Sequence, residues 1–132
     1  MEMRIDFPGG ARVDAHFNGF TVRTDQGPQA GGEASAPTPF DLFLASLGTC
    51  AGIYVLGFCR QRDLPTEGIQ LRERVVRNPE TRKLEAVEID IEVPPTFPEK
   101  YHEALVRAAA QCVVKKQLEN PPAIVVATKV QG

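Results

Sequence analysis

Short apolar runs broken by turn residues make up the first thirty positions of the chain. The breaks are Pro8-Gly9-Gly10, Asn18-Gly19 and Gly27-Pro28. An Asn-Gly pair between two apolar runs is typical of a type I′ hairpin turn, because both residues tolerate a positive φ. The pattern therefore predicts a β-meander.

A long helix is predicted next. Thr38-Pro39-Phe40-Asp41 offers an N-cap, a proline at the first helical position and an acid three residues after the cap. Residues 42–59 contain no charge, which just reaches the length of a membrane span. They include glycines, a serine, a threonine and two cysteines, and the surrounding pattern is that of soluble β-structure. We therefore expect a buried central helix and no membrane partner.

Small residues form a ridge on this predicted helix. Ala45, Gly48 and Gly52 lie about one turn apart, so a second backbone can approach closely there. The approaching element could be the same helix of a second subunit.

The second half of the chain predicts a hairpin, two helical segments and a strand. Apolar and polar residues alternate along 68–77 and along 84–93, and a polar turn joins the two segments. Their charged residues indicate a solvated face. Thr96-Phe97-Pro98-Glu99 repeats the capping pattern, and apolar residues at helical spacing then end at Cys112. A helical segment at 113–118 and a last strand at 123–130 follow. The predicted order is βββ-α-ββ-α-α-β, an α+β fold in one domain over residues 1–132.

Composition narrows the function classes. The 132-residue chain has a net charge of −2, so it offers no footprint for nucleic acid. Its N-terminus lacks the pattern of a signal peptide, which favours a cytoplasmic location. Three cysteines in such a chain read as thiols rather than a disulfide framework. No group of residues has recognisable metal spacing, and no nucleotide or serine-nucleophile motif occurs, so we expect neither metal nor cofactor.

The cysteines can pair in few ways. Cys50 and Cys59 are separated by about 13 Å along one helix and by roughly half a revolution around it. Any intrachain pair must therefore join Cys112 to one of the two helix cysteines, and Cys50, beside the small-residue ridge, is the better candidate. A cysteine on an apolar face is more often an inert small hydrophobe, and this reading fits Cys59.

Two segments resemble the OsmC/Ohr family, and the resemblance is closer to the broad OsmC-like branch than to the organic hydroperoxide resistance branch. Residues 38–50 are similar to the family segment in which a proline, an acid, leucines and small residues lead to a cysteine inside the central helix. Residues 108–118 are similar to the second motif, in which a cysteine stands between two helical segments. The predicted element order is similar to the family's fold over essentially the whole chain.

The resemblance implies an intertwined homodimer with its central helices side by side and two active sites at the subunit boundary. It implies a thiol-dependent peroxidase for organic hydroperoxides, with Cys50 reactive and Cys112 resolving. Sulfenic acid chemistry of this kind ends in a disulfide, which a dithiol reductant must reset. An apolar substrate-binding surface beside Cys50 is expected from four residues of the central helix: Phe40, Phe43, Leu47 and Tyr54.

The chain departs from the family pattern at two places. Phe40 stands where the organic hydroperoxide branch has a glutamate, and Asp41 matches the acid of the broader branch, although it can also be a plain capping acid. The family's activating arginine comes from the first strands, and Arg12 lies one residue away from the position that the family pattern gives it. Arg12 is therefore the candidate for the arginine that activates Cys50, although it can also be simply solvated. The alternative function is therefore a non-catalytic dimer that binds a small hydrophobic ligand.

Overall fold

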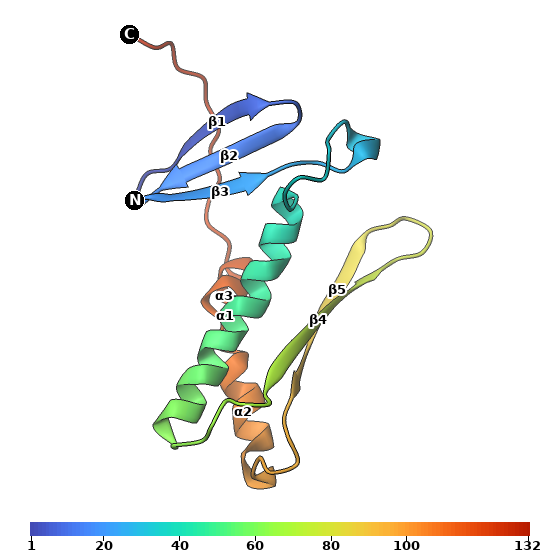
Figure 1. The fold of residues 1–132 in the computed structure, drawn as a ribbon, viewed down its shortest axis with the longest axis vertical. Coiled ribbons are helices and arrows are strands. Elements are labelled where there is room, and N and C mark those ends of the chain that lie inside the picture. The colour runs from blue at the N-terminus through green and yellow to red at the C-terminus, as the bar shows by residue number, and fades with distance from the viewer. The chain divides into compact units, whose positions relative to one another are not determined.

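The computed structural model describes all 132 residues, in two compact units. The first unit is Met1–Ser46 and the second is Leu47–Gly132. Together they contain three α-helices and two antiparallel sheets, so the predicted α+β class is confirmed (Figure 1). The expectation of a single domain stays a prediction.

The first unit is built on a three-stranded meander. Strands β1 (Arg4–Gly9), β2 (Arg12–Phe17) and β3 (Phe20–Thr24) pair antiparallel in the order β1-β2-β3 (Figure 1). The turn between β2 and β3 has Asn18 at φ 48° and Gly19 at φ 79°. Two consecutive positive φ angles are what a type I′ turn requires, so the predicted hairpin is confirmed.

A buried carboxylate organises the loop after β3. Asp25 is only 1% exposed, and its oxygens accept hydrogen bonds from the backbone N–H groups of Gln26, Glu33 and Ser35 and from the Ser35 hydroxyl. These bonds close the loop around the short helix η1 (Pro28–Ala30). They also lower the pKa of Asp25 to about 2, the Ser35 hydroxyl contributing most.

The central helix α1 (Pro39–Gln61) begins as its sequence predicts. The N–H of Asp41 donates to Thr38 Oγ1 at 3.1 Å, and the N–H of Thr38 donates to Asp41 Oδ2 at 3.0 Å. This reciprocal pair is a capping box. The most apolar 18-residue stretch of α1 has a mean hydropathy of 1.9, and 28% of it is buried. By length and composition alone α1 could therefore cross a membrane, a test that the core helix of a soluble protein also passes.

The second unit places a charged hairpin beside its helices. Strands β4 (Gln70–Arg77) and β5 (Leu84–Glu92) pair antiparallel, close to the predicted ranges. Arg72 Nε lies 2.5 Å from Glu92, and Arg74 Nη1 lies 2.6 Å from Asp90. All four side chains are substantially exposed, as expected of a solvated face.

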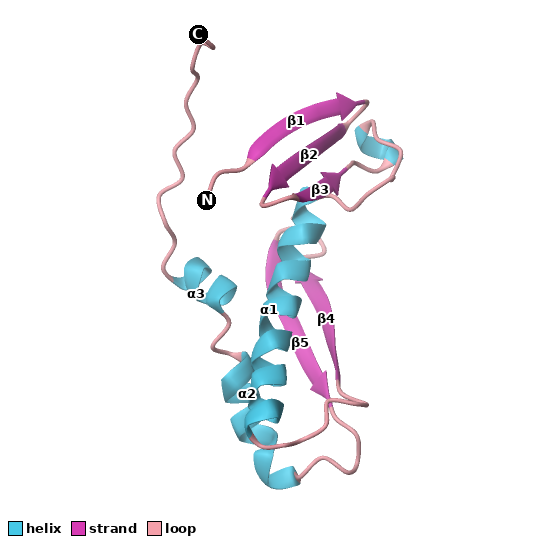
Figure 2. Cartoon of the chain, turned by 60° about the vertical axis from the view of Figure 1, so that its left-hand side comes forward, coloured by secondary structure: helices cyan, strands magenta, loops and turns pink.

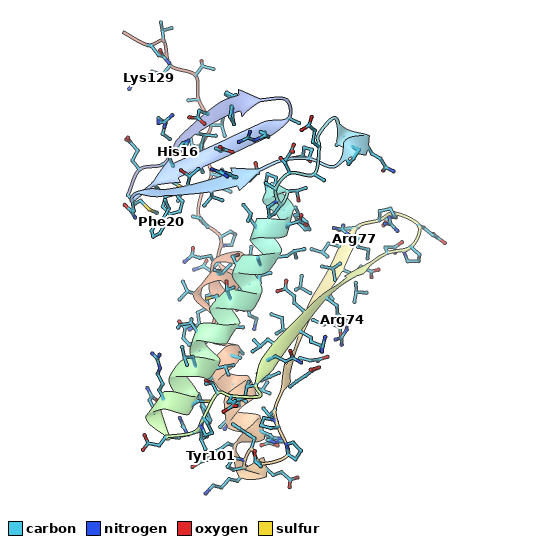
Figure 3. All side chains as sticks on the ribbon, viewed as in Figure 1. His16, Phe20, Arg74, Arg77, Tyr101 and Lys129 are labelled. Atoms are coloured by element: carbon cyan, nitrogen blue, oxygen red, sulfur yellow. The ribbon has the colours of Figure 1, made fainter.

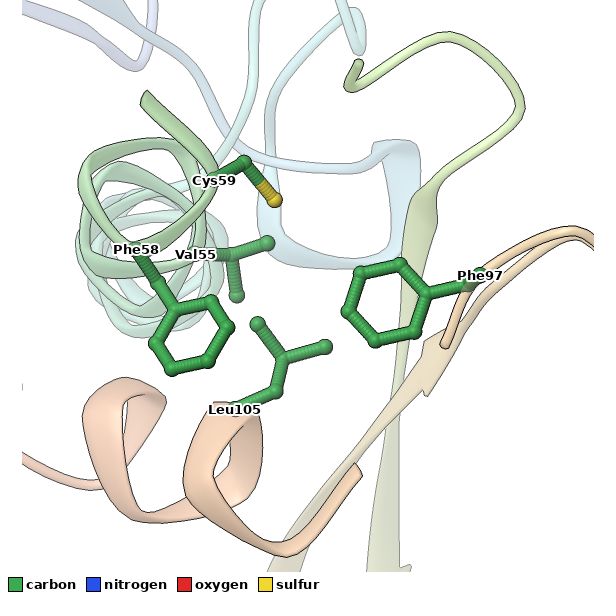
Figure 4. Packing of buried hydrophobic residues seen from close by; sticks show 5 residues of the cluster. All are labelled: Val55, Phe58, Cys59, Phe97 and Leu105. Carbon is green, nitrogen blue, oxygen red and sulfur yellow. The ribbon is translucent and has the colours of Figure 1, made fainter. Parts of the chain in front are cut away.

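The core of the second unit lies where α1 meets the C-terminal helices. Helix η2 (Glu99–Tyr101) leads into α2 (His102–Ala109), and α3 (Val113–Glu119) follows (Figure 2). Figure 4 shows the packed cluster, in which Leu105 of α2 lies against side chains from α1 and against Phe97 in the turn that precedes η2. Its buried members are Val55, Phe58, Cys59, Phe97 and Leu105. The apolar stripe predicted for α2 therefore faces the core.

Two predicted features are wrong. Residues 123–130 form no strand, because none of the five strands of the chain pairs with them, and a strand needs a hydrogen-bonded neighbour (Figure 2). Their apolar side chains are open to solvent, with Val126 91% exposed. The capping box at Thr96 is also absent, because the helix starts only after Pro98. Residues 94–97 form a turn instead, in which the N–H of Phe97 donates to Pro94 O and the Phe97 side chain is buried.

Candidate functional site

The structure brings two of the three thiols together in the second unit. The Cys50 sulfur accepts hydrogen bonds from the backbone N–H groups of Val113 and Val114 and from the thiol of Cys112. Cys50 lies on α1 and is partly exposed, whereas Cys112 is 3% exposed. The two thiols that the sequence pairs thus lie within hydrogen-bonding reach of each other, and their pairing as a redox couple stays a prediction.

A break between two helices creates this arrangement. Helix α2 ends at Ala109, and Cys112 has φ −44° and ψ 122° before α3 begins at Val113. The first N–H groups of a helix have no intrahelical partner. Those of Val113 and Val114 are therefore free to bond the Cys50 sulfur, while Lys115 N–H donates to Cys112 Sγ at 3.4 Å.

The two thiols of the pair have opposite pKa shifts. The pKa of Cys50 is lowered, mainly by the hydrogen bond from the Val114 N–H and then by the bond from the Cys112 thiol, because both favour the thiolate. The pKa of Cys112 is raised, first by burial and also by its bond to Cys50 and the charge there. Of the two thiols, Cys50 is therefore the more readily ionised.

Cys59 has the setting of a structural thiol. Its side chain is fully buried among the core residues shown in Figure 4. Burial raises its pKa, so the unreactive thiol form is favoured.

The other expected site residues are placed as follows. Asp41 is held in the capping box, and Arg12 begins β2 with its Nη2 3.7 Å from Asp14 Oδ2. The expected actions of these two residues on Cys50 stay predictions.

The apolar residues expected to approach Cys50 are not all open. Phe40 is 42% exposed and stacks on Phe43 with ring centroids 5.5 Å apart. Leu47 is buried and Tyr54 is partly buried. Contact of these four side chains with a substrate stays a prediction.

Glu73 is a feature that the sequence reading missed. It lies on β4, between exposed arginines, and its carboxylate accepts from the backbone N–H of Gly48, while Oε2 is buried without a hydrogen-bond partner. Burial raises its pKa. A Cβ on Gly48 would overlap Glu73 Oε1, so within this chain Gly48 makes room for the carboxylate. The signal was available in the alternation of β4, where Glu73 shares its face with apolar Leu71.

The fold and the adjoining thiols define an α+β protein that carries a partly exposed cysteine on a long central helix. The chain belongs to the OsmC-like protein family, because residues 31–127 match the sequence profile of that family. This range contains Cys50 and Cys112 and leaves out β1 to β3. No curated protein matches the sequence significantly.

Solved structures share the fold. A Psychrobacter arcticus protein assigned to osmotic stress induction and the detoxification response has 22% identity and a TM-score of 0.73, over 87% of this chain and 85% of that one. An organic hydroperoxide resistance protein OsmC of Legionella pneumophila, also described as a predicted redox protein, has 19% identity and a TM-score of 0.59, over 89% of each chain. An OsmC-like hydroperoxide resistance protein of Jannaschia sp. has 23% identity and a TM-score of 0.51, over 97% of this chain and 91% of that one. The OsmC-like fold inferred from the sequence motifs is confirmed.

Proposed function

We propose that the protein is a thiol-dependent peroxidase that reduces organic hydroperoxides through Cys50 and Cys112. The observation that carries the proposal is the hydrogen bonding of the Cys50 sulfur by two backbone N–H groups and by the Cys112 thiol. A depressed pKa at a partly exposed cysteine marks a reactive thiol. A second thiol in contact provides the partner that a sulfenic acid needs.

The reaction balances with these two residues and an external reductant. The Cys50 thiolate attacks one oxygen of the hydroperoxide, the O–O bond breaks, and the departing alkoxide takes a proton to leave as an alcohol. The Cys50 sulfenic acid then condenses with the Cys112 thiol, which releases water and forms a disulfide. A dithiol reductant exchanges with this disulfide and restores both thiols.

Apolar hydroperoxides are the favoured substrates. Phe40, Phe43 and Leu47 follow one another at three- and four-residue steps, Tyr54 lies seven residues after Leu47, and Phe43 and Cys50 are also seven residues apart. Such spacing places side chains along one stripe of a helix. The alternative, a dimer that binds a hydrophobic ligand and keeps its cysteines for packing, requires an unperturbed or raised Cys50 pKa, whereas the N–H donors act in the opposite direction.

The active species is proposed to be a homodimer. The C-terminal residues 123–130 form no strand and expose Ile124, Val125, Val126 and Val130 by at least 86% each. Exposed apolar patches of this kind mark interaction sites, and a second copy would cover them. Sedimentation velocity of the full chain is expected to give a dimer, and the double variant Ile124→Lys, Val126→Lys is expected to weaken it. A monomer over the whole concentration range would refute this part of the proposal.

Peroxide treatment with mass mapping tests the chemistry. Reduced protein receives a substoichiometric organic hydroperoxide, beside the Cys112→Ser variant and the matched control Cys59→Ser. The wild type and the control are expected to lose two hydrogen atoms and link Cys50 to Cys112, and the Cys112→Ser variant is expected to retain a trappable sulfenic acid at Cys50. No oxidation, or oxidation confined to Cys59, would overturn the proposal.

A further inference from the structure

A second cluster of chemically active side chains lies on the first sheet, and the thiol chemistry does not use it. Asp6 of β1 is directly opposite Asp14 of β2. His16, which Figure 3 labels, stands two residues further along β2. One ligand atom from each of the three lies within 4.8 Å of the other two. Like charges directly opposite each other destabilise a sheet, so a cation between the carboxylates would be stabilising.

The carboxylate of Asp14 is incompletely satisfied. Its side chain is 8% exposed, and Oδ1 is buried without a hydrogen-bond partner. The nearest cation is Arg12, whose Nη2 is 3.7 Å from Oδ2, beyond hydrogen-bond distance. A buried acceptor without a partner is costly, and such a group in a native fold calls for an explanation. A bound cation would supply the missing partner.

The imidazole of His16 is held so that one nitrogen faces the Asp6 carboxylate. Nδ1 lies 3.1 Å from Thr21 Oγ1, and Nε2 lies 3.2 Å from both oxygens of Asp6. When Nδ1–H donates to Thr21, the Nε2 lone pair faces a carboxylate, and a proton or a metal ion must lie between them. An outer hydrogen bond of this type orients metal-binding histidines.

We propose that Asp6, Asp14 and His16 bind a first-row transition-metal dication such as Zn²⁺. An imidazole nitrogen and two carboxylate oxygens are a ligand set that Zn²⁺ accepts, with a fourth position left for water. At bond lengths of about 2.0–2.2 Å, ligand atoms around a tetrahedral Zn²⁺ lie roughly 3.3–3.6 Å apart, so side-chain rotations that bring the three atoms closer together would close the site. Arg4, 2.6 Å from Asp6, and Arg12 compete for the carboxylates and keep the affinity moderate.

The two histidines of the chain make an internally controlled test possible. The imidazole NMR signals of full-length, reduced protein are followed during titration with Zn²⁺. His16 is expected to shift, whereas His102, which lies against Phe97 in the second unit, is expected to stay unchanged. Equal shifts of the two histidines, or no shift of His16, would overturn the proposal.

Variants separate this site from the thiols. Asp14→Asn and His16→Gln are expected to weaken Zn²⁺ binding by about tenfold or more, the usual effect of disturbing a metal site, and the matched control His102→Gln is expected to leave it unchanged. Co²⁺ is then used as a spectroscopic probe. A thiolate-to-cobalt charge-transfer band, together with loss of binding in Cys50→Ser, would assign the metal to the cysteines and contradict the proposal.

Discussion

The contact between Gly48 and Glu73 makes a sharp prediction about stability. A helix-interior glycine replaced by alanine normally stabilises a protein by up to about 1 kcal/mol, because alanine loses less backbone entropy. At Gly48 the new Cβ would overlap Glu73 Oε1, whose carboxylate is hydrogen-bonded there and has a buried oxygen. We expect Gly48→Ala to lose this benefit and to destabilise the second unit.

The magnitude follows from the two opposing effects. Overpacking of this kind costs about 1–3 kcal/mol, and the helix gain offsets about 1 kcal/mol of it. The net change is then a loss of about 0–2 kcal/mol. Gly57→Ala is the matched control on the same helix, since a Cβ there meets nothing within 4 Å, and it is expected to stabilise by about 0.5–1 kcal/mol.

Urea denaturation of the wild type, both glycine variants and a Glu73→Ala background measures these free energies of unfolding. When Glu73 is truncated, Gly48→Ala is expected to become stabilising, as Gly57→Ala is, and the double-mutant cycle isolates the coupling. Equal stability of Gly48→Ala and Gly57→Ala with Glu73 in place would refute the reasoning.

Two further predictions follow from the pKa shifts. Alkylation resolved by cysteine is expected to label Cys50 at a lower pH than Cys112 and Cys59, because only the Cys50 pKa is lowered; a Cys50 profile identical to that of the denatured chain would contradict this. Asp25, whose pKa falls from 3.8 to about 2 on folding, contributes stability that is present above about pH 4 and is lost as the pH falls toward 2. Urea midpoints measured across this window are expected to fall less steeply for Asp25→Asn than for the wild type, and parallel curves would count against the role given to Asp25.

Local sequence signals predicted most of the elements. The Asn18-Gly19 turn and the Thr38/Asp41 capping box act within a few residues, so their patterns were sufficient. Residues 123–130 have the composition of a strand, but whether they form one depends on a neighbouring strand, which a local pattern cannot supply.

The candidate site was only partly predictable. The family motifs indicated Cys50 and Cys112, yet the N–H groups of Val113 and Val114 that lower the Cys50 pKa became visible only with the break between α2 and α3. The cluster of Asp6, Asp14 and His16 has no ligand spacing in the sequence, because the register of β1 on β2 brings Asp6 to the other two.

The rate at which reduced protein loses its thiols to different peroxides tests the central claim most directly. A bulky organic hydroperoxide and hydrogen peroxide are compared at equal concentration, with Cys50→Ser as the inactive reference and Cys59→Ser as the active control. Thiol loss is expected to be faster with the organic hydroperoxide and to be absent from the Cys50→Ser variant. Equal slow rates with both peroxides, or unchanged thiol loss without Cys50, would contradict a Cys50-dependent organic hydroperoxidase.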